Sequence, residues 1–499
     1  MKQRCGSRPG DLRALAWAER HGEVAERLER AEVSAVAPCR DEAIRRARGG
    51  REGGPTVPGE GLPGARRGWC RRARAALLAV LSALVLGGVA AAGPARLTAQ
   101  ETGSASPTGG VNAARWLDAP YVVLVSFDGF ADRYLDAHDL PNFGRVLERG
   151  VRAQGMIPSF PTKTFPNHYT LVTGLYPGHH GIVANTFMDP ATGRTYRISD
   201  RAAVEDGGWY GGEPLWMTAE RQGMVAASFF WVGSEAEGLR PTHWRRFDGS
   251  VPEDARVDQV LEWLAAPAAE RPHLITTYFE LVDDAGHRYG PDSPDLVPAL
   301  READRLVGRL LDGIDRLPYG DRVYLVLVSD HGMDQHPAAR TVYMEDAVDL
   351  SGLRFGNTGE VVNVYVTGGR ARARALRDRL NTGLEGVRFY LREETPARFH
   401  YRADPRAGDL VGVPDPHVMV FPTRDRAARD GGGHGWDPEY QGMRALFVAA
   451  GPRLKAGATI PAFQNVHVYP FLAELLGLTP APGIDGDARV LKGALRDGG

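Results

Sequence analysis

Carboxylates and imidazoles gather at the ends of three apolar segments and in one glycine-rich segment of this chain. They are Asp128 in YVVLVSFDGF, Asp283 and His287 in HLITTYFELVDDAGH, Asp330 and His331 in RVYLVLVSDHGM, and His434 in GGGHGWD. A single aspartate at a strand end is commonly a turn or helix-capping residue. Carboxylates mixed with imidazoles suit Zn²⁺, with Mn²⁺ or Fe²⁺ as alternatives, better than Ca²⁺. Because a catalytic zinc ion takes about three protein ligands, the set is large enough for two ions.

A second chemical signal is the segment FPTKTFPNHYTLVTGLYPGHHG, which is rich in threonine, proline and histidine. Thr162 and Thr164 are both candidate nucleophiles, although a threonine hydroxyl is a poor nucleophile at neutral pH. No neighbouring general base is evident, so we expect coordination to a metal ion to activate the hydroxyl. Thr164, followed by Phe165 and Pro166, is also typical of a helix start, where free N–H groups favour an anion. We interpret Lys163 as a solvated loop lysine with no role in phosphate binding.

The elements that position these groups are predicted to be strands alternating with helices. The segments at 121–130, 273–287 and 322–333 contain runs that are apolar on both faces, which is typical of buried parallel strands. Residues 254–264 and 296–317 carry apolar residues at helical spacing between them. This order predicts an α/β domain with a mainly parallel central sheet flanked by helices. Ligands of such sheets bind beyond the carboxyl ends of the strands, where the acids and histidines fall.

The region from Tyr343 to about Arg429 has a less regular pattern. VVNVYVTG and HVMVFP are typical of short strands, and residues 370–381 are predicted to form a helix. We expect this region to continue the central sheet and to carry a smaller inserted, cap-like region.

Composition excludes some classes of function. The chain has 499 residues, of which 43% are hydrophobic and 24% charged, as in ordinary globular proteins. Its 60 basic and 62 acidic residues leave a net charge of -2, so no overall field attracts nucleic acid, and no sequence-specific nucleic-acid partner is expected. The three cysteines lie within the first 70 residues, so the rest of the chain must fold without disulfides or thiolate metal ligands.

The N-terminal part is expected to lie outside the mature fold. Residues 1–70 have few large apolar residues and are interpreted as disordered or as the product of a mis-assigned start. Residues 71–94 have the layout of a cleaved signal peptide, with an uncleaved membrane anchor as the alternative. Residues 95–118 are predicted to be a linker, 119–485 the catalytic domain and 486–499 a C-terminal tail.

Seven motifs in order make the chain resemble the nucleotide pyrophosphatase/phosphodiesterase family of the alkaline phosphatase superfamily. They are VSFDGF, FPTKTFPNHYTLVTGLYPGHHGI, GIVANTFMDP, FFWVGSE, ELVDDAGHRYGP, VLVSDHGM and GGHGWD. Together with the closing NVHVYPFLAELLGL, they cover the chain from about Tyr121 to Leu478. The resemblance implies an alkaline-phosphatase-like fold and a single catalytic domain of the bacterial type.

The resemblance also implies a role for each motif residue. One of two zinc ions, or of other divalent ions in their place, would be held by Asp283, His287 and His434, and the second by Asp128, Thr164, Asp330 and His331. Thr164 would be the nucleophile rather than Thr162, and Asn185 would bind a phosphoryl oxygen. By contrast, we interpret four other histidines as ordinary core or surface residues: His138, His179, His273 and His467.

Phe165 would offer a nucleobase a stacking surface, with packing in the core as the alternative. A second aromatic residue from the stretch 231–244 is a further candidate for contacting the base. For Trp231, Trp244 and Tyr210, however, we favour packing in the core.

The activity implied by the resemblance is hydrolysis of nucleoside 5′-phosphodiester or phosphoanhydride bonds through a phosphothreonine intermediate, releasing a nucleoside 5′-monophosphate. Phosphomonoesters, phosphonates and lipid-headgroup diesters are alternative substrates, because substrate choice lies at the rim of the site rather than in its metal ligands. A metal-binding pseudoenzyme is a third hypothesis, disfavoured because no motif ligand is missing. A sulfatase is disfavoured because no Cys/Ser-x-Pro-x-Arg motif occurs. The signal-like segment predicts export to the periplasm or the extracellular space, with membrane contact only if that segment is retained.

Overall fold

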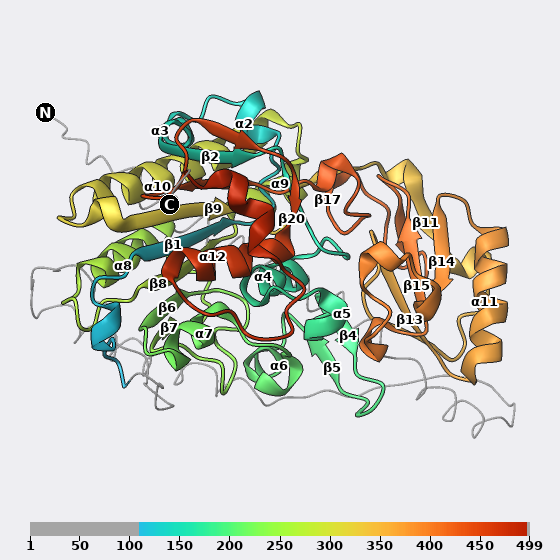
Figure 1. Ribbon diagram of the computed structural model, residues 1–499. Helices are drawn as coiled ribbons and strands as arrows, with labels where there is room; N and C mark the ends of the chain where they lie inside the picture. Colours follow the sequence, from blue (N-terminus) through green and yellow to red (C-terminus); the bar gives the residue numbers. More distant parts are fainter. Residues whose placement is uncertain (1–108, 497–499) are drawn as a thin grey trace, which may run out of the picture. The chain divides into compact units, whose positions relative to one another are not determined.

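The computed structural model describes residues 109–496, and its centre is an eight-stranded sheet (Figure 1). In spatial order the strands are β19 (Ala458–Ile460), β2 (Gly150–Ala153), β18 (Phe447–Ala450), β9 (Val323–Val328), β1 (Tyr121–Phe127), β8 (Leu274–Phe279), β6 (Ala226–Phe229) and β7 (His243–Arg245). Only β18 runs antiparallel to its neighbours, β9 and β2. The predicted mainly parallel sheet is therefore confirmed.

Helices cover both faces of this sheet, as the apolar strands require. Residues of β1 alternate between the faces: Val122 and Leu124 belong to one core cluster and Val123 and Val125 to the other. The first cluster includes residues of α4 (Thr164–Thr173), α7 (Leu215–Arg221) and α12 (Val468–Leu476). The second includes residues of α3 (Pro141–Arg149), α8 (Glu253–Ala265) and α10 (Val297–Asp315), so the two predicted helices form as expected.

Strand register brings the candidate ligands to one level of the sheet. β1 pairs in parallel with β8 and with β9, so that Ser126 lies opposite Tyr278 on one side and Val328 on the other. Asp128 and Asp330 each follow two residues later and therefore emerge side by side at the carboxyl edge. Helix α9 (Leu281–Tyr289) begins just after β8 at the same edge.

The region expected to continue the central sheet does not do so. Its strands β12 (Leu353–Phe355), β13 (Val362–Val366), β15 (Leu410–Pro414) and β14 (Val387–Leu391) form a separate antiparallel sheet in that order. Helix α11 (Gly369–Gly383) packs on it around the core of Leu376 and Leu380, which confirms the predicted helix. The expectation was wrong because a short apolar strand reads the same in either sheet, and hydrogen-bonding partners are a tertiary property.

Smaller elements complete the described fold. Paired short strands are β3 (Met156–Ile157) with β20 (Phe463–Gln464), β4 (Thr186–Met188) with β5 (Thr195–Arg197), β10 (Asp334–His336) with β17 (Gly431–Gly433), and β11 (Thr341–Tyr343) with β16 (Met419–Phe421). Short helices are α2 (Tyr134–Ala137), α5 (Pro177–His180) and α6 (Arg201–Glu205). Among the described residues, none of the helices combines the length and apolar character that a membrane span requires.

Packing extends beyond the predicted domain boundaries at both ends. Asn112, placed in the predicted linker, is buried, and its side chain accepts a hydrogen bond from the N–H of Val225 at 2.7 Å. Leu491 and Ala494, placed in the predicted tail, are buried in the core. The predicted signal segment and residues 1–70 lie outside the described residues.

Candidate active site

Asp128, Asp330 and His331 form a buried cluster at the carboxyl ends of β1 and β9, called here the strand-end group. Nε2 of His331 lies 3.4 Å from Oδ1 of Asp128 and 2.8 Å from Oδ2 of Asp330. The three side chains are at most 2% exposed. The N–H of Gly129 donates to Oδ1 of Asp330 at 3.2 Å, so the loop after β1 also holds the carboxylate that follows β9.

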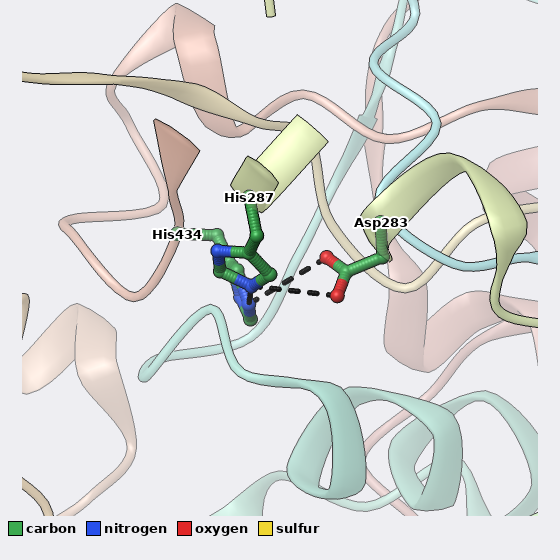
Figure 2. A group of neighbouring side chains, drawn as sticks. All are labelled: Asp283, His287 and His434. Atoms are coloured by element: carbon green, nitrogen blue, oxygen red, sulfur yellow. Dashed lines mark hydrogen bonds and ion pairs between the residues drawn. The ribbon is translucent and has the colours of Figure 1, made fainter. Parts of the chain in front are cut away.

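Asp283, His287 and His434 form a second cluster, called here the helix-loop group (Figure 2). Asp283 and His287 are four residues apart on α9 and therefore share one face of the helix. Nε2 of His287 lies 3.4 Å from one oxygen of Asp283, and Nε2 of His434 lies 3.7 Å from the other. The two Nε2 atoms are 3.1 Å apart. His287 is 41% exposed, which makes this group the more open of the two.

A glycine lets the two groups approach each other. Gly129 has a φ of +67°, and a Cβ atom there would lie 2.8 Å from Oδ1 of Asp283 and 2.9 Å from its Cα. Any other residue would therefore strain the turn and push α9 away from the sheet edge. The imidazole rings of His331 and His434 stack with centroids 3.5 Å apart, so the two groups are direct neighbours.

The donor atoms in both groups fit divalent metal ions. One oxygen of each carboxylate is buried without a hydrogen-bond partner: Oδ1 of Asp128, Oδ1 of Asp283 and Oδ2 of Asp330. Each histidine turns Nδ1 to a backbone carbonyl, at 2.8 Å from Gly432 for His287, 2.8 Å from Gly332 for His331 and 2.9 Å from Thr162 for His434. A ring that donates from Nδ1 keeps a lone pair on Nε2, and all three Nε2 atoms face the carboxylates.

Electrostatics favours the same interpretation. Burial, together with the nearby carboxylates of Asp330 and Asp283, raises the pKa of Asp128 well above its usual range. Burial lowers the pKa of His331 and lowers that of His434 further, so both rings are neutral, the form that binds metal. Buried carboxylates that resist ionisation gain most from a cation, and metal binding there would release protons.

Thr164 is the first residue of α4 and lies beside the strand-end group. Its Oγ1 is 3.3 Å from Nε2 of His331. That nitrogen is the same atom that faces the carboxylates of Asp128 and Asp330. Helix α4 therefore begins at the site, as predicted, and presents its N-terminal N–H groups there. The N–H of Phe165 is one of these, and it donates to Oδ1 of Asn185 at 3.0 Å. Because that bond occupies the amide oxygen of Asn185, its Nδ2 hydrogens are the groups that can bind a ligand, as donors.

The neighbours of Thr164 are engaged elsewhere. The hydroxyl of Thr162 is buried, donates to the carbonyl of Trp436 at 3.0 Å and accepts from the N–H of Gly435 at 2.8 Å. The interpretation of Lys163 as a solvated lysine was wrong, because its side chain is buried and its Nζ lies 2.6 Å from Glu360. Glu360 is 197 residues away in sequence, so local composition could not reveal this pairing.

Two residues at the site were not identified from the sequence. The hydroxyl of Tyr278, on β8, donates to Oδ2 of Asp128 at 2.7 Å. The Nδ1 atom of His168 lies 3.0 Å from the carbonyl oxygen of Thr164 and 3.4 Å from Oδ2 of Asp330. Its position four residues after Thr164 on a predicted helix was the available signal. Tyr278 had no local signal, since an aromatic residue is ordinary in a buried strand.

Aromatic residues divide between core and rim. Trp231 and Tyr210 are buried, as expected, whereas Trp244 is half-buried. Phe165 is also half-buried and lies edge-on to Tyr196, with ring centroids 6.3 Å apart. Phe247, just beyond the stretch considered above, is 38% exposed and lies edge-on to Tyr278, with ring centroids 6.4 Å apart. An exposed aromatic ring therefore stands next to the tyrosine that contacts Asp128.

The four histidines interpreted as ordinary residues belong to neither group. Nδ1 of His179 pairs with Asp485 at 2.7 Å, and Nδ1 of His273 lies 2.9 Å from the carbonyl of Pro120. Nδ1 of His467 accepts from the N–H of Asp487 at 3.0 Å.

The mainly parallel sheet, with acid–histidine groups at its carboxyl edge, places the chain in the alkaline-phosphatase-like class of α/β folds. A family profile described as type I phosphodiesterase/nucleotide pyrophosphatase matches residues 122–437. The chain therefore belongs to this family.

Individual relatives agree with that assignment. The chain is 36% identical over 384 residues to mouse ectonucleotide pyrophosphatase/phosphodiesterase family member 1, covering 73% of this chain and 42% of that protein. It is 35% identical over 382 residues to the venom phosphodiesterase of Macrovipera lebetinus, covering 72% of this chain and 44% of the venom protein. The chain thus spans less than half the length of these curated relatives.

Solved structures are also similar. Murine ectonucleotide pyrophosphatase/phosphodiesterase 5, solved as an inactive threonine-to-alanine variant in complex with AMP, superposes with a TM-score of 0.72 at 29% identity. The match covers 76% of this chain and 100% of that one. The human protein of the same name has a TM-score of 0.72 at 29% identity, covering 75% of this chain and 100% of its own.

Proposed function

We propose that this protein is an exported two-zinc phosphodiesterase and nucleotide pyrophosphatase that uses Thr164 as its nucleophile. It hydrolyses nucleoside 5′-phosphodiester or phosphoanhydride bonds and releases a nucleoside 5′-monophosphate. The observation that carries the proposal is the position of Thr164. Its hydroxyl lies 3.3 Å from His331 of the strand-end group, at the N-terminus of α4 and next to the helix-loop group.

We assign one zinc ion to each group, because each offers three ligand atoms within 4.8 Å of one another. Thr164 would complete the strand-end set, and other divalent ions suit the same donors. When bound, the two ions would supply Lewis-acid stabilisation of the threonine oxygen and of the leaving oxygen.

The chain's own residues define a two-step displacement. Oγ1 of Thr164 gives up its proton and bonds to phosphorus while the bond to the leaving alcohol or phosphate breaks. The electron pair leaves with that oxygen, which takes up a proton. Water then attacks phosphorus, which releases the nucleoside monophosphate and returns the hydroxyl to Thr164. The Nδ2 donors of Asn185 and the N-terminus of α4 stabilise charge on the phosphoryl oxygens. An inactive threonine-to-alanine variant of a relative that binds AMP supports a threonine in this role.

The nucleobase is proposed to lie against Phe165 and Phe247. Phe165 adjoins the nucleophile and is half-buried, and Phe247 is an exposed ring beside Tyr278. Base–aromatic stacking tolerates any base, since every base has a π-face. Because a stacked base contributes about 1–3 kcal/mol, Phe247→Ala should raise KM for nucleotide esters about fivefold to 150-fold and leave nitrophenyl phosphate turnover unchanged. If Phe247→Ala impaired the hydrolysis of both substrates equally, Phe247 would not contact the nucleobase.

A substrate panel tests the activity itself. We expect the zinc-loaded protein to hydrolyse the nitrophenyl ester of thymidine 5′-monophosphate faster than nitrophenyl phosphate or nitrophenyl phosphocholine. Preference for nitrophenyl phosphate would assign the site to phosphomonoesters, and preference for the phosphocholine ester would assign it to lipid-headgroup diesters. No turnover of any ester by protein loaded with zinc, manganese or iron would support the pseudoenzyme hypothesis.

Export rests on residues 71–94, whose composition is that of a signal peptide. The relatives include ectoenzymes and venom enzymes by name, which supports an extracytoplasmic location for this protein. N-terminal sequencing of the protein recovered from the periplasm or medium should find a start after residue 94. A start before residue 71 would contradict the assignment of that segment.

A further inference from the structure

A buried ion pair joins the nucleophile segment to the small antiparallel sheet. Lys163 directly precedes Thr164, and its Nζ lies 2.6 Å from Oε2 of Glu360. The side chains are 9% and 7% exposed, so solvent screens the pair poorly. Glu360 lies just before β13, and its neighbour Gly359 exchanges two backbone hydrogen bonds with Val420, at 2.8 and 2.9 Å. The acidic partner is therefore anchored in the inserted region rather than in the central sheet.

The pair packs directly against the loop that carries His434. A Cβ atom added to Gly435 would lie 2.6 Å from Cε of Lys163 and 2.9 Å from Cβ of Glu360. A Cβ atom at Gly433 would lie 2.6 Å from Oε1 of Glu360. A side chain at either residue flanking His434 would therefore displace the ion pair, because the pair occupies the space that such a side chain would fill. Gly435 in addition has a φ of +136°, a conformation that other residues rarely adopt.

The same loop is tied to the nucleophile segment by hydrogen bonds. Nδ1 of His434 lies 2.9 Å from the carbonyl oxygen of Thr162, and Gly435 donates its N–H to the Thr162 hydroxyl. The histidine ring thus has its tautomer and direction set by the residue that precedes Lys163. Three chain segments, far apart in sequence, meet at this point.

Charge as well as shape matters here. A buried ammonium without its carboxylate would lie beside the loop that carries His434, since a Cβ atom at Gly435 would be only 3.0 Å from Nζ of Lys163. It would repel a divalent cation held by that histidine. Glu360 neutralises it, and the ammonium in turn holds the pKa of the buried Glu360 below its usual value despite the opposing effect of burial. The pair is neutral only while both members are present.

We infer that the Lys163–Glu360 ion pair is a positioning element that holds the His434 loop in place for metal binding by the helix-loop group. The inference rests on the proposed metal site. Residues outside the ligand sphere that orient a metal-binding histidine typically contribute tenfold to 100-fold in metal affinity. Loss of the pair should therefore weaken the binding of one metal ion and leave the binding of the other unchanged. A general loss of protein stability would not produce this selectivity.

Zinc titration of the metal-free, full-length protein against a chromophoric chelator tests this inference. The wild type should bind two ions. Glu360→Gln should weaken one of them about tenfold to 100-fold and leave the other unchanged. The double variant Lys163→Met/Glu360→Gln carries no unpaired charge and should fold where the single variant fails. It should still show the selective loss, because the two side chains no longer hold the loop.

A thermodynamic cycle identifies which ion is affected. His287→Ala already damages the helix-loop group, so adding Glu360→Gln to it should cause little further loss of zinc affinity. Asp330→Asn damages the strand-end group instead, so adding Glu360→Gln should still weaken the remaining ion by its full effect. Asp304→Asn is the matched control. Asp304 is also buried, but it binds the N–H groups of Asn142 and Phe143 at the start of α3, away from both groups, so its variant should bind both ions normally.

The outcomes separate this inference from the proposed function. A wild type that binds no zinc overturns the metal site itself. A wild type that binds two ions, with a double variant that binds both equally well, overturns only the role of the ion pair. An equal loss at both ions also overturns it, because positioning of one loop cannot weaken the two sites alike.

Discussion

The two candidate metal-ligand groups use the same side-chain types but differ in how the fold supports them. The strand-end group stands on β1 and β9, two central strands of the sheet, and its side chains are at most 2% exposed. The helix-loop group combines one turn of α9 with a glycine-flanked loop, and His287 is 41% exposed. Neighbouring strands have little freedom to move apart, whereas a loop depends on its packing partners. The strand-end group therefore suits the nucleophile, and the helix-loop group suits a face open to solvent and substrate.

The largest effect should come from the hydroxyl beside the strand-end group. We expect Thr164→Ala to lower turnover of the thymidine nitrophenyl ester by roughly four orders of magnitude or more, as for other covalent nucleophiles. Both zinc ions should still bind, since three other ligands remain in the strand-end group. Thr173→Ala is the control on the same helix, where the hydroxyl donates to the carbonyl of Tyr169 and accepts from the N–H of Leu175, and contacts neither group. If Thr164→Ala turned over the ester at a rate close to that of the wild type, Thr164 would not be the nucleophile.

Metal removal should distinguish the groups by rate. Because the helix-loop group is open to solvent, we expect chelator to remove its ion first and the buried ion more slowly, as two separate phases. His287→Ala should abolish the fast phase, and Asp330→Asn should abolish or accelerate the slow one. Inductively coupled plasma measurement of zinc retained over time reports both. A single phase for the wild type would contradict the difference in accessibility.

Tyr278 sharpens the comparison, because its hydroxyl donates a hydrogen bond to Asp128 of the strand-end group. Tyr278→Phe should weaken the strand-end ion about tenfold to 100-fold and leave the other ion unchanged, by the usual effect of an outer hydrogen bond. Zinc titration measures both affinities. Tyr324→Phe, near the start of β9, is the control with a buried ring away from the site. Equal weakening of both ions by Tyr278→Phe would show that the groups are not independent.

A buried histidine outside both groups gives the smallest effect. Burial lowers the pKa of His180 from its usual value of about 6.5 to about 3. Between about pH 6.5 and 3, this histidine is protonated in the unfolded chain but neutral in the folded chain. It therefore lowers the free energy of unfolding as pH falls through that range, by up to about 1.4 kcal/mol per pH unit. His180→Asn retains an acceptor for the N–H of Ile182 and should show a shallower slope in urea unfolding. Identical slopes would assign the acid sensitivity to other groups.

Much of the central fold was predictable from local patterns. The structure forms β1 and β9 from the apolar runs, and α8 and α10 from the segments with helical spacing. These elements were predictable because the spacing of apolar residues alone indicates a strand buried on both faces or a helix buried along one stripe. The clustering of the candidate ligands was predictable for the same reason, since they follow strands or share one turn of a helix. The inserted region was less predictable, because its short strands give no sign of which sheet they join.

What local patterns missed lies in contacts between distant segments. Lys163 looked like a loop lysine beside two threonines, and only its partner Glu360, 197 residues away, makes it a buried ion-pair residue. Tyr278 looked like any strand aromatic, and only the parallel register with β1 brings its hydroxyl to Asp128, 150 residues earlier in the chain.

By itself, the sequence determined the α/β alternation, the family motifs and the positions of the carboxylates, imidazoles and hydroxyl that we propose to bind metal or attack phosphorus. Those properties are local, since they depend on side-chain chemistry and on spacing within one strand or helix turn. The tertiary structure decided which ligands share a group, which group is open, and which side chains hold them in place. These depend on strand register and on close contacts such as those at Gly129 and Gly435, where distances below 3 Å decide what fits. Such distances arise only when segments hundreds of residues apart pack together.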